Sequence, residues 1–352
     1  MAPGRIGAEG PTSVRTVMAP GPASAEPAEL VIAILNWNGY ALTRACVRSL
    51  ARLEGPGHTI LIVDSGSKAP EAERLAAEFP GIVPLSLGRN VGVAGGYNAS
   101  IRWARNHGAR FVLLLNNDTL VQDPLLARRL VDACAEDVFA VGPLVRDGSG
   151  RVWSSGGTMD WQTYLTGHWQ EAGIISRDSP YEVAWIDGSC MLVSVAAACD
   201  LGGFDETFFL YWEETDICFR ARDHGLRCLV EPRTEIVHLV GQTARPSQVD
   251  RYMMRNSILF MRRHANLRQN VDFMLRLACW RAPIFAARRI KHRGGIRQTA
   301  GIVLGSFAWN ILDAIRERGW RRRPGGSLVC EADSARPAEV AGDLTSPTRP
   351  LR

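Results

Sequence analysis

The sequence predicts an α/β fold built on a mainly parallel sheet with helices on both faces. From residue 30 onward, short apolar runs rich in β-branched residues alternate with amphipathic segments of helical length. Continuous apolar strands that alternate with helices are typical of parallel sheets buried on both faces. Polar residues follow the runs, at the strand ends where such sheets bind ligands. The pattern therefore indicates an α/β domain with one binding edge.

The first half of the chain contains four predicted strands, and polar loops lie between them and the helices that follow. The strands cover residues 30–35, 59–63, 82–85 and 111–115. The loops are Asn36-Trp37-Asn38-Gly39, Asp64-Ser65-Gly66-Ser67, Arg89-Asn90-Val91-Gly92 and Asn116-Asn117-Asp118. Because the carboxyl ends of parallel strands meet at one sheet edge, these four loops predict a single site.

The alternation of strands and helices weakens after Gly142 and then resumes. We expect Gly-, Trp- and Ser-rich strands over residues 152–169, a strand at 185–193, a helix at about 213–224 and strands near Leu226 and Ile236. The chain shows no internal repeat.

The segment from residue 249 to 323 is predicted to form arginine-rich helices with apolar stripes. The stripes are Phe273, Leu277, Trp280 and Ile284, and then Leu304, Ala308, Ile311 and Ile315. Between Arg251 and Arg323 there are 17 basic and three acidic residues, whereas the rest of the chain has 24 and 33. This composition favours either a helical appendage packed on the core or contact with an anionic membrane surface.

Composition and pattern divide the 352 residues into four parts. Small, polar and Pro-rich residues predict disordered tails at 1–28 and 324–352. Between the tails we expect an α/β domain at 29–260 and a basic amphipathic helical segment at 261–323.

Several protein classes are excluded or disfavoured. The eight cysteines form no CxxC pair and no histidines stand at zinc spacing, which favours buried reduced thiols. Residues 1–28 contain no apolar signal region, and the uncharged stretch at 298–312 is 15 residues long. A membrane span needs roughly 20 apolar residues, so we expect a cytoplasmic protein without one. The absence of GxGxxG after the first strand and of GxxxxGK[ST] disfavours dinucleotide enzymes and P-loop ATPases.

Four motifs have both a chemical and a structural interpretation. Asp118 ends the most hydrophobic strand, where its carboxylate could hold a cation that bridges two phosphates or simply close an Asx turn. The glycines of residues 88–96 fit either a phosphate or a tight turn. Glu213, Glu214 and Asp216 suit a helix start or a general base. His238 completes a metal site or is structural.

Taken together, these motifs resemble those of family 2 glycosyltransferases with the GT-A fold, in particular the rhamnosyltransferase-like branch. The resemblance covers residues 30 to about 260. The stretches that carry it, in order, are residues 31–39 (VIAILNWNG), 63–67 (VDSGS), 89–98 (RNVGVAGGYN), 115–118 (LNND), 202–206 (GGFDE), 209–218 (FLYWEETDIC) and 237–238 (VH). Each stretch alone is common, and the ordered set is specific.

The resemblance implies a mixed, mainly parallel central sheet and a role for each motif. Asp64 would bind the pyrimidine ring, and Asp118 with His238 would bind Mg²⁺ or Mn²⁺. Glu214 stands where the family has its general base, with Glu213 and Asp216 as alternatives. The other donor-binding residues implied are Asn36, Trp37, Asn38, Gly92, Gly95, Asn98, Asn116, Asn117, Gly188 and Ser189. Acceptor or accessory roles fall to Asp205, Trp212, Arg255 and Asn256.

These roles predict an inverting, metal-dependent transferase in cell-surface polysaccharide synthesis. The expected donor is a nucleoside diphosphate sugar, first of all dTDP-L-rhamnose, and the expected acceptor is a lipid-linked or polymeric glycan. We expect the enzyme on the inner face of the cell membrane, bound through residues 261–323, with no nucleic acid partner. The alternatives are a nucleotidyltransferase of similar fold and a non-catalytic module that binds membrane or nucleic acid.

Overall fold

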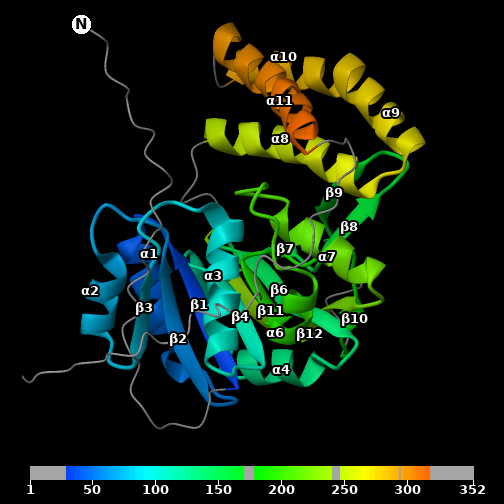
Figure 1. Ribbon diagram of the computed structural model, residues 1–352. Helices are drawn as coiled ribbons and strands as arrows, with labels where there is room; N and C mark the ends of the chain where they lie inside the picture. The colour runs from blue at the N-terminus through cyan, green and yellow to red at the C-terminus, as the bar shows by residue number, and fades with distance from the viewer. Residues whose placement is uncertain (1–28, 170–177, 240–245, 293–294, 318–352) are drawn as a thin grey trace, which may run out of the picture.

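The computed structural model of the protein describes residues 29–169, 178–239, 246–292 and 295–317. The predicted tails at 1–28 and 324–352 lie outside the described residues. Figure 1 shows an α/β unit with a group of helices, α8 to α11, lying together on one side of it.

A mixed sheet forms the centre of the molecule, with ten strands in the described part of the chain. Its main order is β10-β12-β6-β11-β4-β1-β2-β3, and four of the seven neighbouring pairs are parallel. The strands are β1 (Leu30–Asn36), β2 (His58–Asp64), β3 (Ile82–Ser86), β4 (Phe111–Asn116), β5 (Thr119–Val121), β6 (Val138–Asp147), β7 (Val152–Ser154), β10 (Tyr181–Glu182), β11 (Cys190–Ser194) and β12 (Arg227–His238). A separate hairpin pairs β8 (Gly157–Asp160) with β9 (Leu165–His168). The predicted α/β class with a mixed, mainly parallel sheet is confirmed.

Helices cover both faces of this sheet, as the continuous apolar strands predict. Alternate residues of β1 enter two separate apolar clusters, Val31 and Ala33 one and Leu30, Ile32 and Ile34 the other. The helices of the α/β unit are α1 (Tyr40–Ser49), α2 (Glu71–Glu78), α3 (Gly92–Asn106), α4 (Leu126–Ala133), α6 (Val195–Asp200) and α7 (Glu213–Asp223), with a 3-10 turn at Leu50–Arg52.

The C-terminal helices begin before the expected boundary at residue 260, because α8 (Pro246–His264) runs through it. Residues 258–261 of α8 are buried in the main apolar cluster, so the helix belongs to the α/β core as much as to the helical layer. The layer continues with α9 (Leu267–Arg276), a π-helical turn (Leu277–Arg281), α10 (Ala282–His292) and α11 (Ile296–Arg316).

Helix α11 buries mainly polar side chains, with Ile302 as the apolar exception, and exposes several large apolar ones. Ser306 and Asn310 are buried, whereas Leu304, Ile311 and Ile315 are more than half exposed. Of the fourteen large apolar side chains that are exposed in the described ranges, eleven lie between residues 267 and 315. Within those ranges, no helix combines the length and the apolar character that a membrane crossing requires.

Candidate active site

The loops after β1 and β2 are joined by a buried polar network. Asn36 donates from Nδ2 to Asp64 Oδ2 at 2.7 Å and to Glu71 Oε2 at 2.9 Å. The other oxygen of Asp64 accepts the backbone N–H of Ser67 at 2.7 Å. A carboxylate has about four lone-pair sites, so each oxygen of Asp64 retains capacity for a further donor. Asn36 is buried and holds the carboxylate in place.

The turn after β1 is shaped by a close approach to the loop after β4. A Cβ on Gly39 would lie 2.2 Å from Asn117 Nδ2, so a larger residue there would displace the Asn117 side chain. Asn117 donates to Thr43 Oγ1 at 3.1 Å, and Asn38 takes a left-handed backbone with φ of 50°. Trp37 is 39% exposed on this turn, which leaves its indole face open beside the predicted nucleotide loops.

Three residues of the glycine-rich helix start serve packing. Gly92 has φ of 74°, and a Cβ there would meet the Phe209 carbonyl oxygen at 2.3 Å. A Cβ on Gly95 would lie 2.8 Å from the side chain of Val91. The side chain of Asn98 is buried and exchanges hydrogen bonds of 2.8 Å with the backbone of Phe204. These contacts fix α3 against residues 204–209.

The hydroxyl of Tyr97 lies within the electrostatic influence of carboxylates from the loop after β4, the loop before β11 and the start of α7. The hydroxyl donates to the Gly188 carbonyl at 2.7 Å and lies 3.2 Å from Asn116 Oδ1. Burial raises the pKa of Tyr97 well above its usual range, and negative charge on four carboxylates raises it further. They are Glu213, Glu214, Asp187 and Asp118. The structure thus brings Asp118 together with the acidic helix start.

At the first turn of α7, Glu213 is buried and Glu214 is partly buried, and each has one carboxylate oxygen that is unused. The Oε2 atoms of both accept no hydrogen bond within the described part of the chain. Burial raises the pKa of Glu214 to about 7, against the opposing effect of backbone N–H groups, and the charge of Asp187 adds to the rise. Burial and the charge of Glu214 raise the pKa of Glu213 further. With a pKa of about 7, Glu214 can take up a proton near neutral pH.

Two acid and histidine pairs stand beside this cluster. His238 Nε2 lies 3.2 Å from Asp118 Oδ1, and His168 Nδ1 lies 3.5 Å from Asp187 Oδ2. Burial lowers the pKa of His168 below its usual value. For His238, burial has the same tendency, but the hydrogen bond and charge of Asp118 outweigh it and raise the pKa.

The donor atoms of Asp118 and His238 fit a divalent cation that is completed by a substrate. Two atoms that bind one octahedral ion at right angles lie about 3 Å apart, close to their separation here. In the described ranges no three Asp, Glu, His or Cys side chains converge into a complete metal site. One or two protein ligands with phosphate oxygens are the usual arrangement for Mg²⁺.

A strained loop carries the chain into the acidic helix start. Phe209, Tyr211 and Trp212 have φ values of 64°, 67° and 75°, which non-glycine residues rarely adopt. Asn256 of α8 donates to the carbonyls of Phe208, Leu210 and Tyr211 at 2.9, 2.8 and 2.7 Å.

Arg255 of α8 adds to this hold on the loop, through hydrogen bonds of 2.8 Å to the Thr207 carbonyl and 2.6 Å to the Phe208 carbonyl. Trp212 is buried, and its indole N–H donates no hydrogen bond within the described residues, so it remains able to bind a substrate oxygen. The two neighbouring residues on α8 therefore fix the backbone that precedes Glu213.

Two other predicted site residues are occupied by ion pairs with α8 and α7. Asp216 is fully buried between Arg220 Nε and His264 Nε2, each at 2.8 Å. Asp205 forms a buried ion pair with Arg263. Both oxygens of Asp216 have partners, so its carboxylate links α7 to the end of α8.

Three residues of the cluster were not singled out from the sequence: Tyr97, His168 and Asp187. Asp187 directly precedes Gly188 and Ser189, whose hydroxyl is buried and has no hydrogen-bond partner in the described ranges. A polar residue at the end of the apolar run 185–186 was an available signal for Asp187. His168 lies in a hairpin that the sequence does not place near the sheet edge.

The sequence profile for glycosyl transferase family 2 matches residues 31–196. The chain carries a family 2 glycosyltransferase domain. This domain includes the loops after β1, β2 and β4, and the acidic helix start lies just beyond the matched range. The assignment favours the glycosyltransferase prediction over a nucleotidyltransferase or a binding module.

Relatives of this glycosyltransferase chain include two enzymes named for rhamnose transfer. It is 28% identical over 202 residues to the N-acetylglucosaminyl-diphospho-decaprenol L-rhamnosyltransferase of Mycobacterium tuberculosis. The aligned region covers 51% of this chain and 66% of the relative. It is 21% identical over 222 residues to the dTDP-rhamnosyl transferase RfbF of Shigella flexneri, covering 58% and 71%. The chain thus spans about two-thirds of the length of these relatives.

Solved glycosyltransferases share the fold. The structure of GalNAc-T7 with UDP, GalNAc and Mn²⁺ has a TM-score of 0.52 and 15% identity, covering 68% of this chain and 48% of that one. A mannosyltransferase from Pyrobaculum calidifontis in complex with GDP-Man and Mn²⁺ has a TM-score of 0.50 and 14% identity, covering 87% and 86%. The predicted GT-A type fold is confirmed.

Proposed function

We propose that this chain transfers a sugar, first of all L-rhamnose from dTDP-L-rhamnose, to a lipid-linked or polymeric glycan with inversion at the anomeric carbon. The observation that carries the proposal is the convergence of Asp118, Asp187, Glu213 and Glu214 around Tyr97 at the carboxyl edge of the sheet. The relatives named for rhamnose transfer support this donor. The lipid diphosphate in the name of the mycobacterial relative supports a lipid-linked acceptor in cell-surface polysaccharide synthesis.

The nucleotide end of the donor lies, in this proposal, on the loops after β1 and β2. Asp64 accepts a pyrimidine N–H with the lone pairs that Asn36 and Ser67 leave free. The exposed indole of Trp37 packs against the base. The diphosphate then reaches Asn116, Asn117 and Asp118, and the sugar lies against Gly188 and Ser189.

In the transfer step, Glu214 acts as the general base. Its free Oε2 takes the proton of an acceptor hydroxyl, the acceptor oxygen bonds to the anomeric carbon, and the bond from that carbon to the phosphate oxygen breaks. The nucleoside diphosphate leaves with the bonding electrons. A pKa of about 7 lets the side chain take up this proton near neutral pH. Burial, and then the charge of Glu214, raises the pKa of the neighbouring Glu213 well above its usual value.

Asp118 and His238 would hold a divalent cation, Mg²⁺ or Mn²⁺, when the donor is bound. A cation bound there supplies charge that offsets the negative charge of the leaving diphosphate. Trp212, with an unused indole N–H, orients the acceptor beside Glu214.

We propose that the enzyme binds the inner face of the cell membrane through its helical layer, α9 to α11. Helices α9 to α11 expose most of the large apolar side chains of the described chain beside many arginines. On α11, large apolar side chains face outward. Contact with lipid removes such side chains from water, which lowers the free energy of the protein. We propose anionic lipid as the partner of this surface and no nucleic acid.

The test is release of dTDP from dTDP-L-rhamnose by the purified chain, with and without Mn²⁺ and with extracted lipid-linked glycan as acceptor. We expect metal-dependent release that Glu214→Gln abolishes and that the exposed control Glu73→Gln preserves. Absence of release and of binding with every pyrimidine-sugar nucleotide would overturn the proposal. Activity with another sugar would correct only the donor.

A further inference from the structure

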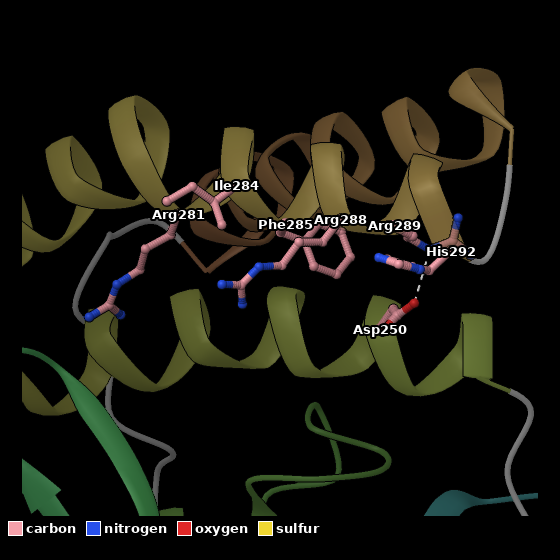
Figure 2. A pocket seen from close by; sticks show the side chains of 7 residues that line it. All are labelled: Asp250, Arg281, Ile284, Phe285, Arg288, Arg289 and His292. Atoms are coloured by element: carbon pink, nitrogen blue, oxygen red, sulfur yellow. Dashed lines mark hydrogen bonds and ion pairs between the residues drawn. The ribbon is translucent and has the colours of Figure 1, made fainter.

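A cavity of about 510 Å³ lies between α8 and α10, and none of its lining residues belongs to the carboxylate cluster. Figure 2 shows side chains of α10 extending toward α8, with Asp250 of α8 facing them. The lining combines four cationic or titratable side chains with two apolar ones and one carboxylate: Arg281, Arg288, Arg289, His292, Ile284, Phe285 and Asp250.

The only carboxylate in this lining is already neutralised. Asp250 Oδ2 accepts from Arg289 Nε at 2.9 Å, and Arg289 also reaches the hydroxyl of Thr299 at 3.1 Å. Arg289 is buried, so this pair forms a fixed wall of the cavity. Its charges cancel, so within the described residues this carboxylate offers no net counter-charge to Arg281 and Arg288.

The other two arginines of the lining, Arg281 and Arg288, form no ion pair within the described residues. Arg281 donates to the backbone carbonyls of Thr163 and Tyr164, which are neutral acceptors. Burial, and then the nearby charge of Arg276, lowers the pKa of Arg281. Arg288 is exposed and has no hydrogen bond or ion pair within the described residues. A partly enclosed site with this charge favours an anion with several oxygens, since guanidinium groups bind phosphate with paired hydrogen bonds.

The apolar part of the lining indicates what carries that anion. Ile284 is 41% exposed on α10, and the same helix exposes Ile290. Both belong to the set of exposed apolar side chains on α9 to α11 described above. A positive cavity that opens onto an apolar surface fits a molecule with a phosphate group and a hydrocarbon chain.

We propose that this cavity binds the phosphate group of an anionic membrane lipid. Arg281 and Arg288 hold the phosphate, and Ile284 and Phe285 contact the adjoining chain. The inference rests on the proposed membrane contact and adds to it a specific headgroup site, whose failure can be observed separately. A free phosphate offers the same charge without the chain.

The test compares vesicle binding by three proteins: the full chain, Arg288→Ala and the control Arg297→Ala. Arg297 is exposed on α11 outside the cavity, so its replacement removes the same charge from the same helical layer. Binding is measured by co-sedimentation with phosphatidylglycerol vesicles and with phosphatidylcholine vesicles, at roughly physiological salt so that distant charges are screened.

We expect Arg297→Ala to weaken binding to phosphatidylglycerol about five-fold or less, as a diffuse surface charge would. Arg288→Ala should weaken it about ten-fold or more, because a hydrogen bond between charged groups is lost. Equal effects of the two variants would overturn the headgroup site while leaving membrane contact intact. If the full chain does not bind anionic vesicles, the membrane proposal itself fails.

A second measurement separates lipid from free phosphate. Inorganic phosphate is titrated against the thermal stability of the full chain and of Arg288→Ala. A stabilisation by millimolar phosphate that requires Arg288, with vesicle binding unchanged by the variant, would assign the cavity to a soluble phosphate and overturn the lipid proposal.

Discussion

Replacing Asn256 with alanine should disable the transferase while leaving most of its fold intact. The Asn256 amide donates to three carbonyls of residues 208–211, at 2.7 to 2.9 Å, and holds a loop with three left-handed non-glycine residues. Each such residue costs about 1–3 kcal/mol, so the loop keeps its shape only while its surroundings impose it. An amide has two hydrogens, and losing two buried hydrogen bonds costs about 2–4 kcal/mol. Relaxation of the loop would move Glu214 out of reach of the acceptor.

If that free energy is lost from the transition state, kcat falls about 30- to 1,000-fold, since each 1.4 kcal/mol is a factor of ten. The matched control is Asn310→Ala. Asn310 is also buried and donates to two carbonyls at 3.0 Å, on α8 and α11, without touching the loop. Both variants should unfold at similarly reduced temperatures, and only Asn256→Ala should lose kcat with little change in KM for the donor. Equal kcat values for the two variants would refute a positioning role for Asn256.

Three further predictions concern single carboxylates. Glu214→Gln should lower kcat about 10²- to 10⁴-fold without weakening donor binding. In the unmodified enzyme, kcat/KM should fall as pH decreases through about 7, because Glu214 becomes protonated there. A rate that does not respond to pH between 6 and 8 would exclude Glu214 as the base. Asp118→Ala should remove the increase in donor affinity that Mn²⁺ produces, measured by calorimetry with and without the metal; an undiminished increase would place the cation elsewhere. Asp216→Asn should reduce the free energy of unfolding by about 3–5 kcal/mol in a denaturant titration, because Arg220 stays buried without its partner. The pKa of Asp216 is depressed in the folded state, so this stabilisation is present at neutral pH and is lost as pH falls through that depressed value; a variant as stable as the original chain would contradict it.

The sequence predicted the sheet and most of its binding edge, because both follow from local patterns. Apolar runs followed by polar loops can be recognised in the sequence. This pattern predicted that Asp64 and Asp118 lie at or just after strand ends, as they do. Asp187 and His168 were not found because their proximity to Asp118 and His238 depends on how distant strands meet. No spacing in the sequence encodes that meeting.

Side-chain roles were harder to predict than positions. Asn98 was expected to line the donor, yet its amide is used by the backbone of Phe204. Asp216 was an alternative base, and its partner His264 lies 48 residues away at the end of α8. The boundary at residue 260 followed a change in charge composition, whereas the buried apolar residues of α8 continue across it. These roles depend on hydrogen bonds between residues far apart in the sequence, and such hydrogen bonds cannot be predicted from composition.

The hold of α8 on both the active-site loop and α11 has a consequence for how the protein opens. Arg262 pairs with Asp313 of α11 at 2.9 Å, and the same helix carries Asn256 and His264. Loop, helix and outer layer should therefore open together as one cooperative unit, with a shared rate of amide hydrogen exchange. Any surface that binds α11 would slow exchange at residues 208–212. An enzyme built in this way is most ordered at its catalytic loop when its outer helices are bound.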